Sequence, residues 1–158
     1  MRKSILFLGV GGVGKTTAIY RLLGFNNSVC VATRPSIYRI FYSGRWYDLV
    51  DMPGQMAVEV AQATARNLAL HFDRIILMYD LTRQETYEAL LEIWSTVCVL
   101  RGKCLSAREI VIVGNKRDLA EELGYSVEAD SSQFNAVDVR QISALKDPSE
   151  IVARAVLL

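Results

Sequence analysis

The residues best suited to chemistry lie near the start of the chain, at residues 9–16 (Gly-Val-Gly-Gly-Val-Gly-Lys-Thr). This stretch follows an apolar run, precedes a helix-like segment and fits the pattern G-x-x-x-x-G-K-S/T of phosphate-binding loops. Its glycines allow consecutive backbone N–H groups to surround an anion. Lys15 is placed to reach the β- and γ-phosphates of a nucleotide, and the Thr16 hydroxyl to ligate Mg²⁺. We therefore predict nucleotide contacts from Gly11, Gly12, Val13, Gly14, Lys15, Thr16 and Thr17.

A second motif, Asn115-Lys116-Arg117-Asp118, matches N-K-x-D after an apolar run. The Asp118 carboxylate can accept hydrogen bonds from the ring N–H and the exocyclic amine of guanine, whereas adenine presents an acceptor and no matching amine. A mismatched base would leave a desolvated carboxylate unsatisfied, which gives strong discrimination. Asn115 can brace neighbouring loops, and the aliphatic part of Lys116 can lie over the base. Together the two motifs predict GTP and GDP as ligands.

With these motifs the sequence resembles the Ras-like small GTPases, with Rab-like and Arf-like features at residues 79–82 (Tyr-Asp-Leu-Thr) and 114–119. The resemblance covers nearly the whole chain. Residues 51–55 (Asp-Met-Pro-Gly-Gln) resemble the D-x-x-G-Q loop of that family. The resemblance implies that Asp51 holds Mg²⁺ through water, that the Gly54 N–H contacts the γ-phosphate, and that Gln55 orients the attacking water.

Two further segments resemble motifs of the family but differ from them at one residue each. Ser143 and Ala144 resemble the S-A-K box, whose backbone touches the guanine oxygen, so the resemblance places both residues and Leu145 in the nucleotide site. Position 145 is Leu where the family usually has Lys, which implies a looser side of the base pocket. Pro53 replaces a small residue and resembles the D-x-P-G loop of translation-type GTPases. Because the γ-phosphate donor is on Gly54, Pro53 stiffens the loop without removing that donor.

The family also has a Thr in its first switch loop, which caps Mg²⁺ and the γ-phosphate. Thr33 is favoured by its position in the loop, and Ser28 and Ser36 are alternatives. Arg34, in the same loop, is either an arginine finger supplied in cis or, more commonly for such a residue, a solvated contact to a partner. The catalytic residues implied are Lys15, Thr33 and Gln55, and the metal-holding residues are Thr16, Thr33 and Asp51.

Short apolar runs alternate with segments of helical period. This pattern predicts an α/β fold of the P-loop NTPase type, with a mostly parallel six-stranded sheet, one antiparallel edge strand and helices on both faces. The strands are expected at residues 4–9, 36–42, 46–51, 74–80, 110–114 and 137–142. The helices are expected at residues 15–23, 58–72, 82–100 with Thr82 and Glu85 as a capping box, 127–135, and after an Asp147 N-cap.

Composition limits the class of protein. With 158 residues, of which 51% are hydrophobic, the chain can bury one core and is short for two, so we expect a single G domain over residues 1–158. A net charge of +1 gives no reason to expect a nucleic-acid partner. Three cysteines without C-x-x-C spacing favour reduced thiols in the cytoplasm. Without a long apolar run, a myristoylation signal or a prenylation box, no autonomous membrane anchor is expected.

These observations predict a guanine-nucleotide-binding switch that uses Mg²⁺ and hydrolyses GTP slowly, since the sequence offers no strong general base. Its partners would be an exchange factor, an activating protein and effectors that contact the switch loops. One alternative is an interaction module that binds GTP or GDP without useful hydrolysis, which Pro53, Leu145 and the open choice of switch Thr motivate. Another is a P-loop nucleotide kinase, for which the sequence shows neither an arginine-rich lid nor an acceptor pocket.

Overall fold

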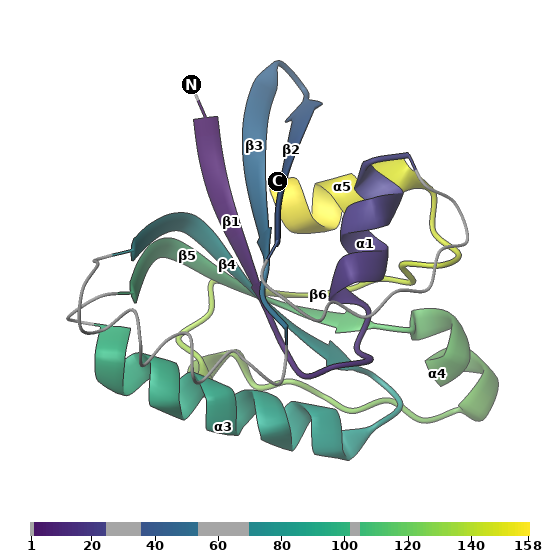
Figure 1. Ribbon diagram of the computed structural model, residues 1–158. Helices are drawn as coiled ribbons and strands as arrows, with labels where there is room; N and C mark the ends of the chain where they lie inside the picture. The colour runs from purple at the N-terminus through teal and green to yellow at the C-terminus, as the bar shows by residue number, and fades with distance from the viewer. Residues whose placement is uncertain (1, 25–35, 54–69, 102–104) are drawn as a thin grey trace.

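The computed structural model describes residues 2–24, 36–53, 70–101 and 105–158. Six strands form one sheet in the order β2-β3-β1-β4-β5-β6 (Figure 1). The strands are β1 (Arg2–Leu8), β2 (Ser36–Tyr42), β3 (Arg45–Asp51), β4 (Leu70–Asp80), β5 (Leu105–Asn115) and β6 (Asp138–Gln141). Only the β2–β3 pair is antiparallel; the β1–β3, β1–β4, β4–β5 and β5–β6 pairs are parallel. The predicted mostly parallel sheet with one antiparallel edge strand is therefore confirmed.

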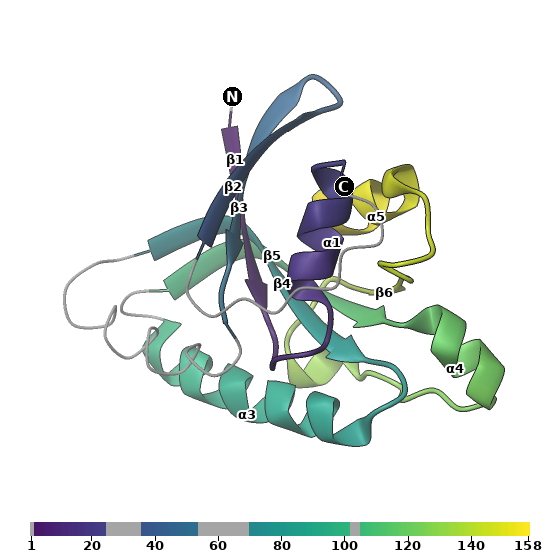
Figure 2. The same cartoon turned by 45° about the vertical axis from the view of Figure 1, so that its right-hand side comes forward.

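Helices cover both faces of this sheet. The α-helices are α1 (Lys15–Leu22), α3 (Gln84–Arg101), α4 (Arg117–Leu123) and α5 (Ser149–Leu157), and a short 3₁₀ helix, η2, spans Ser131–Gln133. Figure 1 shows α3 below the sheet and α1 beside α5 on the opposite face, and the turned view of Figure 2 agrees. Helices on both faces were predicted, and this is confirmed.

The core is divided by the sheet into two apolar clusters because successive strand residues point to opposite faces. In β1, Leu6 and Leu8 belong to the cluster under α3, together with Trp94 of that helix. Ile5 and Phe7 belong to the cluster under α1 and α5. Strand segments buried on both faces are expected to be apolar at every position, as residues 5–8, 75–79 and 110–113 of the central strands are.

Two predicted helices are wrong in part. The helix expected at residues 58–72 lies mostly outside the described residues, but its last part, from Leu70, belongs to β4 and pairs with β5 from Leu105. The helix expected at residues 127–135 is reduced to η2. There the Val127 N–H donates to the Leu81 carbonyl at 2.8 Å and the Val127 carbonyl accepts from the Tyr79 hydroxyl at 2.7 Å. The Val127 carbonyl, which would accept a hydrogen bond within a helix, is thus already occupied, and the Val127 N–H holds this segment beside Leu81.

Two predicted helix caps are also wrong. Helix α3 begins at Gln84, and the Thr82 hydroxyl donates to the Asp80 carboxylate at 2.6 Å. Helix α5 begins after Pro148, which makes no side-chain cap, and the Asp147 carboxylate accepts from the Ser143 N–H at 2.8 Å. In both cases a side chain that could cap a helix by sequence position instead fixes a loop at the carboxyl edge of the sheet.

Candidate functional site

The loop between β1 and α1 lies at the carboxyl edge of the sheet, where β3, β4 and β5 also end (Figure 1). Gly14 is the residue before α1 and has φ +102°, a backbone conformation that side chains disfavour. A Cβ at Gly14 would lie 2.1 Å from the Asn115 Nδ2 atom. A glycine at this position is therefore required both by the turn of the loop and by its close approach to the end of β5.

Lys15 is buried, with 6% of its surface exposed. Its ammonium group donates to the Gly9 carbonyl at 2.7 Å and to the Val10 carbonyl at 3.2 Å. Burial lowers the pKa of Lys15 to about 8, and the Asp51 carboxylate opposes that shift. The side chain is thus held inside the phosphate-loop concavity, where a polyanion would favour its charged form.

Thr16 and Asp51 meet at the start of α1 and the end of β3. The Thr16 hydroxyl donates to Asp51 Oδ2 at 2.5 Å, and Asp51 is fully buried. Asp51 Oδ1 is also buried and has no hydrogen-bond partner within the described residues. A hydroxyl and a carboxylate are the hard oxygen donors that Mg²⁺ prefers, and an unsatisfied buried carboxylate oxygen favours a bound cation or its water. These residues therefore fit a magnesium site.

Asn115 connects the two motifs. Its Nδ2 group donates to the Val13 carbonyl at 2.8 Å, and its Oδ1 atom accepts from the Ala144 N–H at 2.9 Å. The side chain is 3% exposed. A buried amide that satisfies both of its polar ends fixes its neighbours in register. The phosphate loop and the loop around Ala144 are therefore held at a set distance by a residue from a third loop.

Asp118 and Lys116 lie at the beginning of α4. The Ser143 hydroxyl donates to Asp118 Oδ1 at 2.7 Å, while the Lys116 ammonium lies 2.9 Å from Asp80 Oδ2. Asp80 is 1% exposed, and hydrogen bonds from Thr82 and Lys116 lower its pKa although burial opposes them. The Lys116 head group is therefore anchored, which leaves its aliphatic part to line the site.

A cavity of about 380 Å³ lies between these loops, a volume within the usual range for small-ligand sites. Most of the predicted contacts described so far surround it. Its lining consists of Gly12, Gly14, Thr17, Asn115, Lys116, Asp118, Leu119, Ser143, Ala144, Leu145 and Lys146. Leu145, the departure from S-A-K, is 39% exposed and presents an apolar side chain on this lining. Four predicted contacts in the same loop and at the start of α1 do not line the cavity: Gly11, Val13, Lys15 and Thr16.

Most residues predicted to take part in GTP hydrolysis lie outside the described part of the chain. Thr33, Gly54 and Gln55 lie outside the described residues, as do Ser28 and Arg34. Ser36, the remaining alternative for the switch hydroxyl, is the first residue of β2 and pairs with Asp51 of β3. Pro53 is described and buried. The choice of switch hydroxyl and the role of Gln55 stay predictions.

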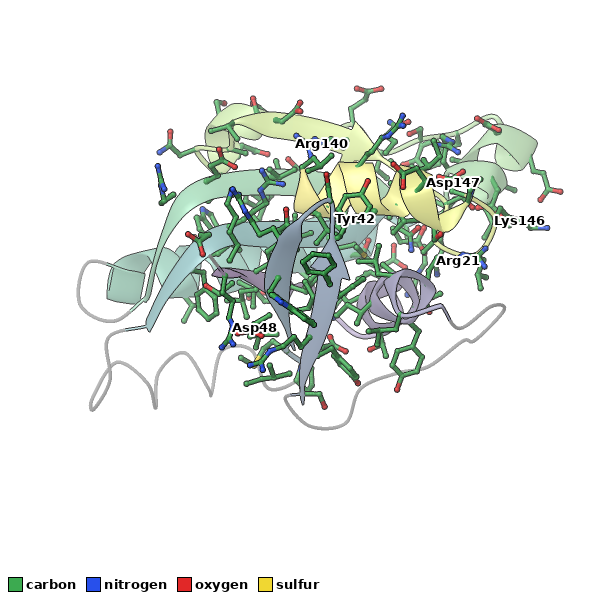
Figure 3. The ribbon with its side chains drawn as sticks, turned by 90° about the horizontal axis from the view of Figure 1, so that it is seen from above. Arg21, Tyr42, Asp48, Arg140, Lys146 and Asp147 are labelled. Carbon is green, nitrogen blue, oxygen red and sulfur yellow. The ribbon has the colours of Figure 1, made fainter. Side chains whose placement is uncertain are left out.

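Sequence reasoning missed several residues that support the base side of the site. Arg21 of α1 donates to the Leu145 carbonyl, Asp147 binds the Ser143 N–H, and Asp80 holds Lys116. Figure 3 shows Arg21, Lys146 and Asp147 at one end of the molecule, beside α1 and α5. The only signal in the sequence was the proximity of Asp147 to the S-A box, and that position suited a helix cap equally well.

The sheet order, the phosphate loop and the adjoining cavity define a P-loop nucleotide-binding protein of the α/β class. The model of the Ras family matches residues 4–149, so the chain belongs to the Ras family. The resemblance to Ras-like small GTPases is thereby confirmed. None of the described helices is long and apolar enough to cross a membrane.

Similar proteins are themselves named as small GTPases or their relatives. The chain is 31% identical to the Ras-related protein Rab-44 of Homo sapiens over 79% of its own length and 12% of that protein. It is 28% identical to the small COPII coat GTPase SAR1 of Encephalitozoon cuniculi over 80% of its length and 55% of that protein. It is 22% identical to the GTP-binding protein Di-Ras3 of Homo sapiens over 72% of its length and 51% of that protein. The chain thus spans about half or less of the relatives it matches.

Proposed function

We propose that this chain is a guanine-nucleotide-binding switch that binds GTP and GDP with Mg²⁺ and hydrolyses GTP slowly. The observation that carries the proposal is the position of Asn115, which joins the phosphate loop at Val13 to the base-side loop at Ala144 around one cavity. A phosphate site and a base site at a fixed separation are what a nucleotide requires. Membership of the Ras family supports the same function.

Selection of guanine is assigned to Asp118 and the adjoining loop. The Asp118 carboxylate lines the cavity and is oriented by the Ser143 hydroxyl, which occupies one of its acceptor positions. Its remaining lone pairs suit the N–H and amine of guanine. The backbone at residues 143–145 would meet the guanine oxygen, and the Leu145 side chain would give apolar contact where the family usually has Lys.

The phosphates would be held by Lys15 and the backbone N–H groups of residues 11–17. Thr16 and Asp51 would hold Mg²⁺, which when bound neutralises charge on the phosphate oxygens. We assign the switch hydroxyl to Thr33, γ-phosphate contact to the Gly54 N–H, and orientation of the attacking water to Gln55. Because the sequence offers no strong general base, slow turnover that partners accelerate is expected.

The proposed switch function also implies protein regulators and a cellular compartment. We propose that an exchange factor, an activating protein and effectors contact the switch loops, and that residues 1–158 act as one G domain. The low net charge gives no reason to propose a nucleic-acid partner, and three cysteines without C-x-x-C spacing support a cytoplasmic setting.

The first test is the affinity of the purified protein for GDP, GTP and ATP in the presence of Mg²⁺, measured by displacement of a fluorescent nucleotide. We expect tight binding of GDP and GTP. ATP should bind at least about a hundredfold more weakly, because adenine leaves the Asp118 carboxylate without its hydrogen-bond donors. A preference for ATP would favour the nucleotide-kinase alternative and overturn the assignment of Asp118.

The second test separates the switch from an interaction module without useful hydrolysis, an alternative that Pro53 and Leu145 favour. Single-turnover GTP hydrolysis is measured with and without cell extract, for the native chain and for Gln55→Leu. We expect slow hydrolysis that the extract accelerates, and a variant that binds GTP normally but turns it over more slowly. No hydrolysis in either condition would establish the module, and equal turnover by the variant would remove Gln55 from the mechanism.

A further inference from the structure

The side chain of Asp147 links parts of the base-side loop that are separate in sequence. Asp147 is 7% exposed, its Oδ2 atom accepts from the Ser143 N–H at 2.8 Å, and its Oδ1 atom is paired with the Arg117 guanidinium. The Asp147 N–H also donates to the Ser143 carbonyl at 2.7 Å. The turn from Ser143 to Asp147 is therefore closed by two hydrogen bonds, one of which depends on a buried carboxylate.

Arg117 ties this turn to the other base-recognition motif. It is the variable residue of N-K-x-D, and its side chain is 34% exposed against 9% for that of Asp147. Its Nη1 atom donates to the Gln141 carbonyl at 3.3 Å, and its backbone N–H donates to the Ile142 carbonyl at 3.1 Å. One residue thus binds both the end of β6 and the carboxylate that shapes the following turn.

This turn must present backbone N–H groups to the base. The N–H groups of Ser143 and Ala144 are taken by Asp147 and Asn115, and that of Lys146 by the Ser143 carbonyl. Within the described part of the chain, the Leu145 N–H has no protein acceptor, and Leu145 lines the cavity. It is therefore the donor left for the guanine oxygen, and its placement depends on the turn that Asp147 closes.

We propose that Arg117 and Asp147 are positioning residues for guanine: their ion pair holds the turn at residues 143–147 so that the Leu145 N–H meets the guanine oxygen, and thereby sets the lifetime of bound nucleotide. The proposal rests on the guanine-binding function proposed above. Because Leu145 brings no cation to the base, the accuracy of the backbone placement carries more of the affinity than it would with Lys there.

The physical consequence of breaking the pair is local. Removal of the Asp147 carboxylate leaves the Ser143 N–H without its acceptor in a residue that is 1% exposed. The turn then relaxes to find another partner or water, and the alignment of the next N–H groups is lost. Removal of Arg117 leaves Asp147 as a buried charge without its cation, which disturbs the same turn.

The experiment measures the rate of GDP release from the native chain, Asp147→Ala, Arg117→Ala and the double variant, by stopped-flow fluorescence. Each single variant is expected to release GDP about tenfold faster, as the loss of one oriented hydrogen bond implies. The double variant should release it no faster than the worse single one, because both act through one turn. Arg117→Lys, which keeps the charge, should recover part of the loss.

The matched control is Glu121→Gln, since the Glu121 carboxylate lies 3.8 Å from the Arg117 Nε atom and its side chain is 74% exposed. It should release GDP at the native rate. Thermal unfolding of each variant without nucleotide reports any general loss of stability, and Asp147→Asn, which keeps an oxygen for Ser143, serves if Asp147→Ala does not fold.

A second nucleotide distinguishes positioning from a general structural effect. In 6-thioguanosine diphosphate a sulfur, a poor acceptor, replaces the guanine oxygen, while the groups that face Asp118 are kept. If the pair acts through that oxygen, the variants should release this analogue within about twofold of the native rate. Equal acceleration for both nucleotides, or GDP release at the native rate from Asp147→Ala, would overturn the proposal. Failure of the native chain to bind GDP would instead refute the proposed function.

Discussion

The two ends of the nucleotide cavity are built in different ways. The phosphate end comes from one continuous segment, in which a glycine turn leads directly into Lys15 and Thr16 of α1. The base end comes from two separate segments, around Asn115 and around Ser143, that are joined by hydrogen bonds across 29 and 25 residues of sequence. The Asp147 carboxylate closes the turn of the second segment. We therefore expect phosphate binding to depend on local backbone conformation, and base selection to depend on tertiary contacts between side chains.

The largest effect expected at the phosphate end is that of Lys15→Ala. Removal of the buried ammonium that we assign to the phosphates should weaken GDP binding about a thousandfold, as truncation of a desolvated charge partner does. The loss should be the same for GDP and inosine diphosphate, because Lys15 does not touch the base. Isothermal titration gives both affinities, with Lys3→Ala at the other end of β1 as the control. A loss that differed between the two bases would contradict this division of the cavity.

At the base end, Asp118→Asn should exchange one specificity for another. The amide offers a donor where the carboxylate offered only acceptors, and xanthine carries an oxygen where guanine carries its amine. Affinity for GDP should fall about a hundredfold while affinity for xanthosine diphosphate rises. Competition binding measures both, with Glu121→Gln on the same helix as the control. Unchanged preference for GDP would remove Asp118 from base recognition.

The contact between the two ends can be tested with a matched pair of glycines. Gly14→Ala puts a Cβ against Asn115 at a positive φ, whereas Gly24 has φ +92° and no described atom within 4 Å of an added Cβ. Backbone strain alone should cost Gly24→Ala about 1 kcal/mol of unfolding free energy, and the added clash should bring Gly14→Ala to about 3 kcal/mol. Chemical denaturation without nucleotide measures both. Equal losses would show that Asn115 yields and that the two ends are not rigidly joined.

The smallest effect concerns the titration of Lys15. Its pKa of about 8 is lower than that of an unfolded-chain lysine, so between these values the unfolded state binds more protons and stability rises with pH. The nucleotide-free protein should gain about 1 kcal/mol from pH 8 to pH 9 relative to Lys15→Met, which keeps the apolar stem without the charge. Denaturation at a series of pH values measures the difference. Parallel curves for the two proteins would contradict the lowered pKa.

Prediction from the sequence succeeded where the pattern lay within one segment, and it failed where the structure depends on contacts between segments. The strands were located because buried apolar runs are distinctive, and the phosphate loop because its residues are contiguous. The end of the helix expected at residues 58–72 was wrong because a short apolar run suits either a helix or a strand until a partner strand such as β5 is present. Thr33 and Gln55, outside the described residues, remain predictions.

The sequence by itself determined the class of fold and located the phosphate loop and the carboxylate that we propose selects the base, because each depends on residue types at fixed spacing. Only the tertiary structure decided what Asp147, Arg117 and Arg21 do, since Arg117 pairs with Asp147 across 30 residues and Arg21 binds the Leu145 carbonyl across 124 residues. In the sequence, Asp147 before a Pro is typical of a helix cap. In the structure, its carboxylate instead binds the Ser143 N–H and the Arg117 guanidinium. Satisfying those buried polar groups was favoured over capping an exposed helix end.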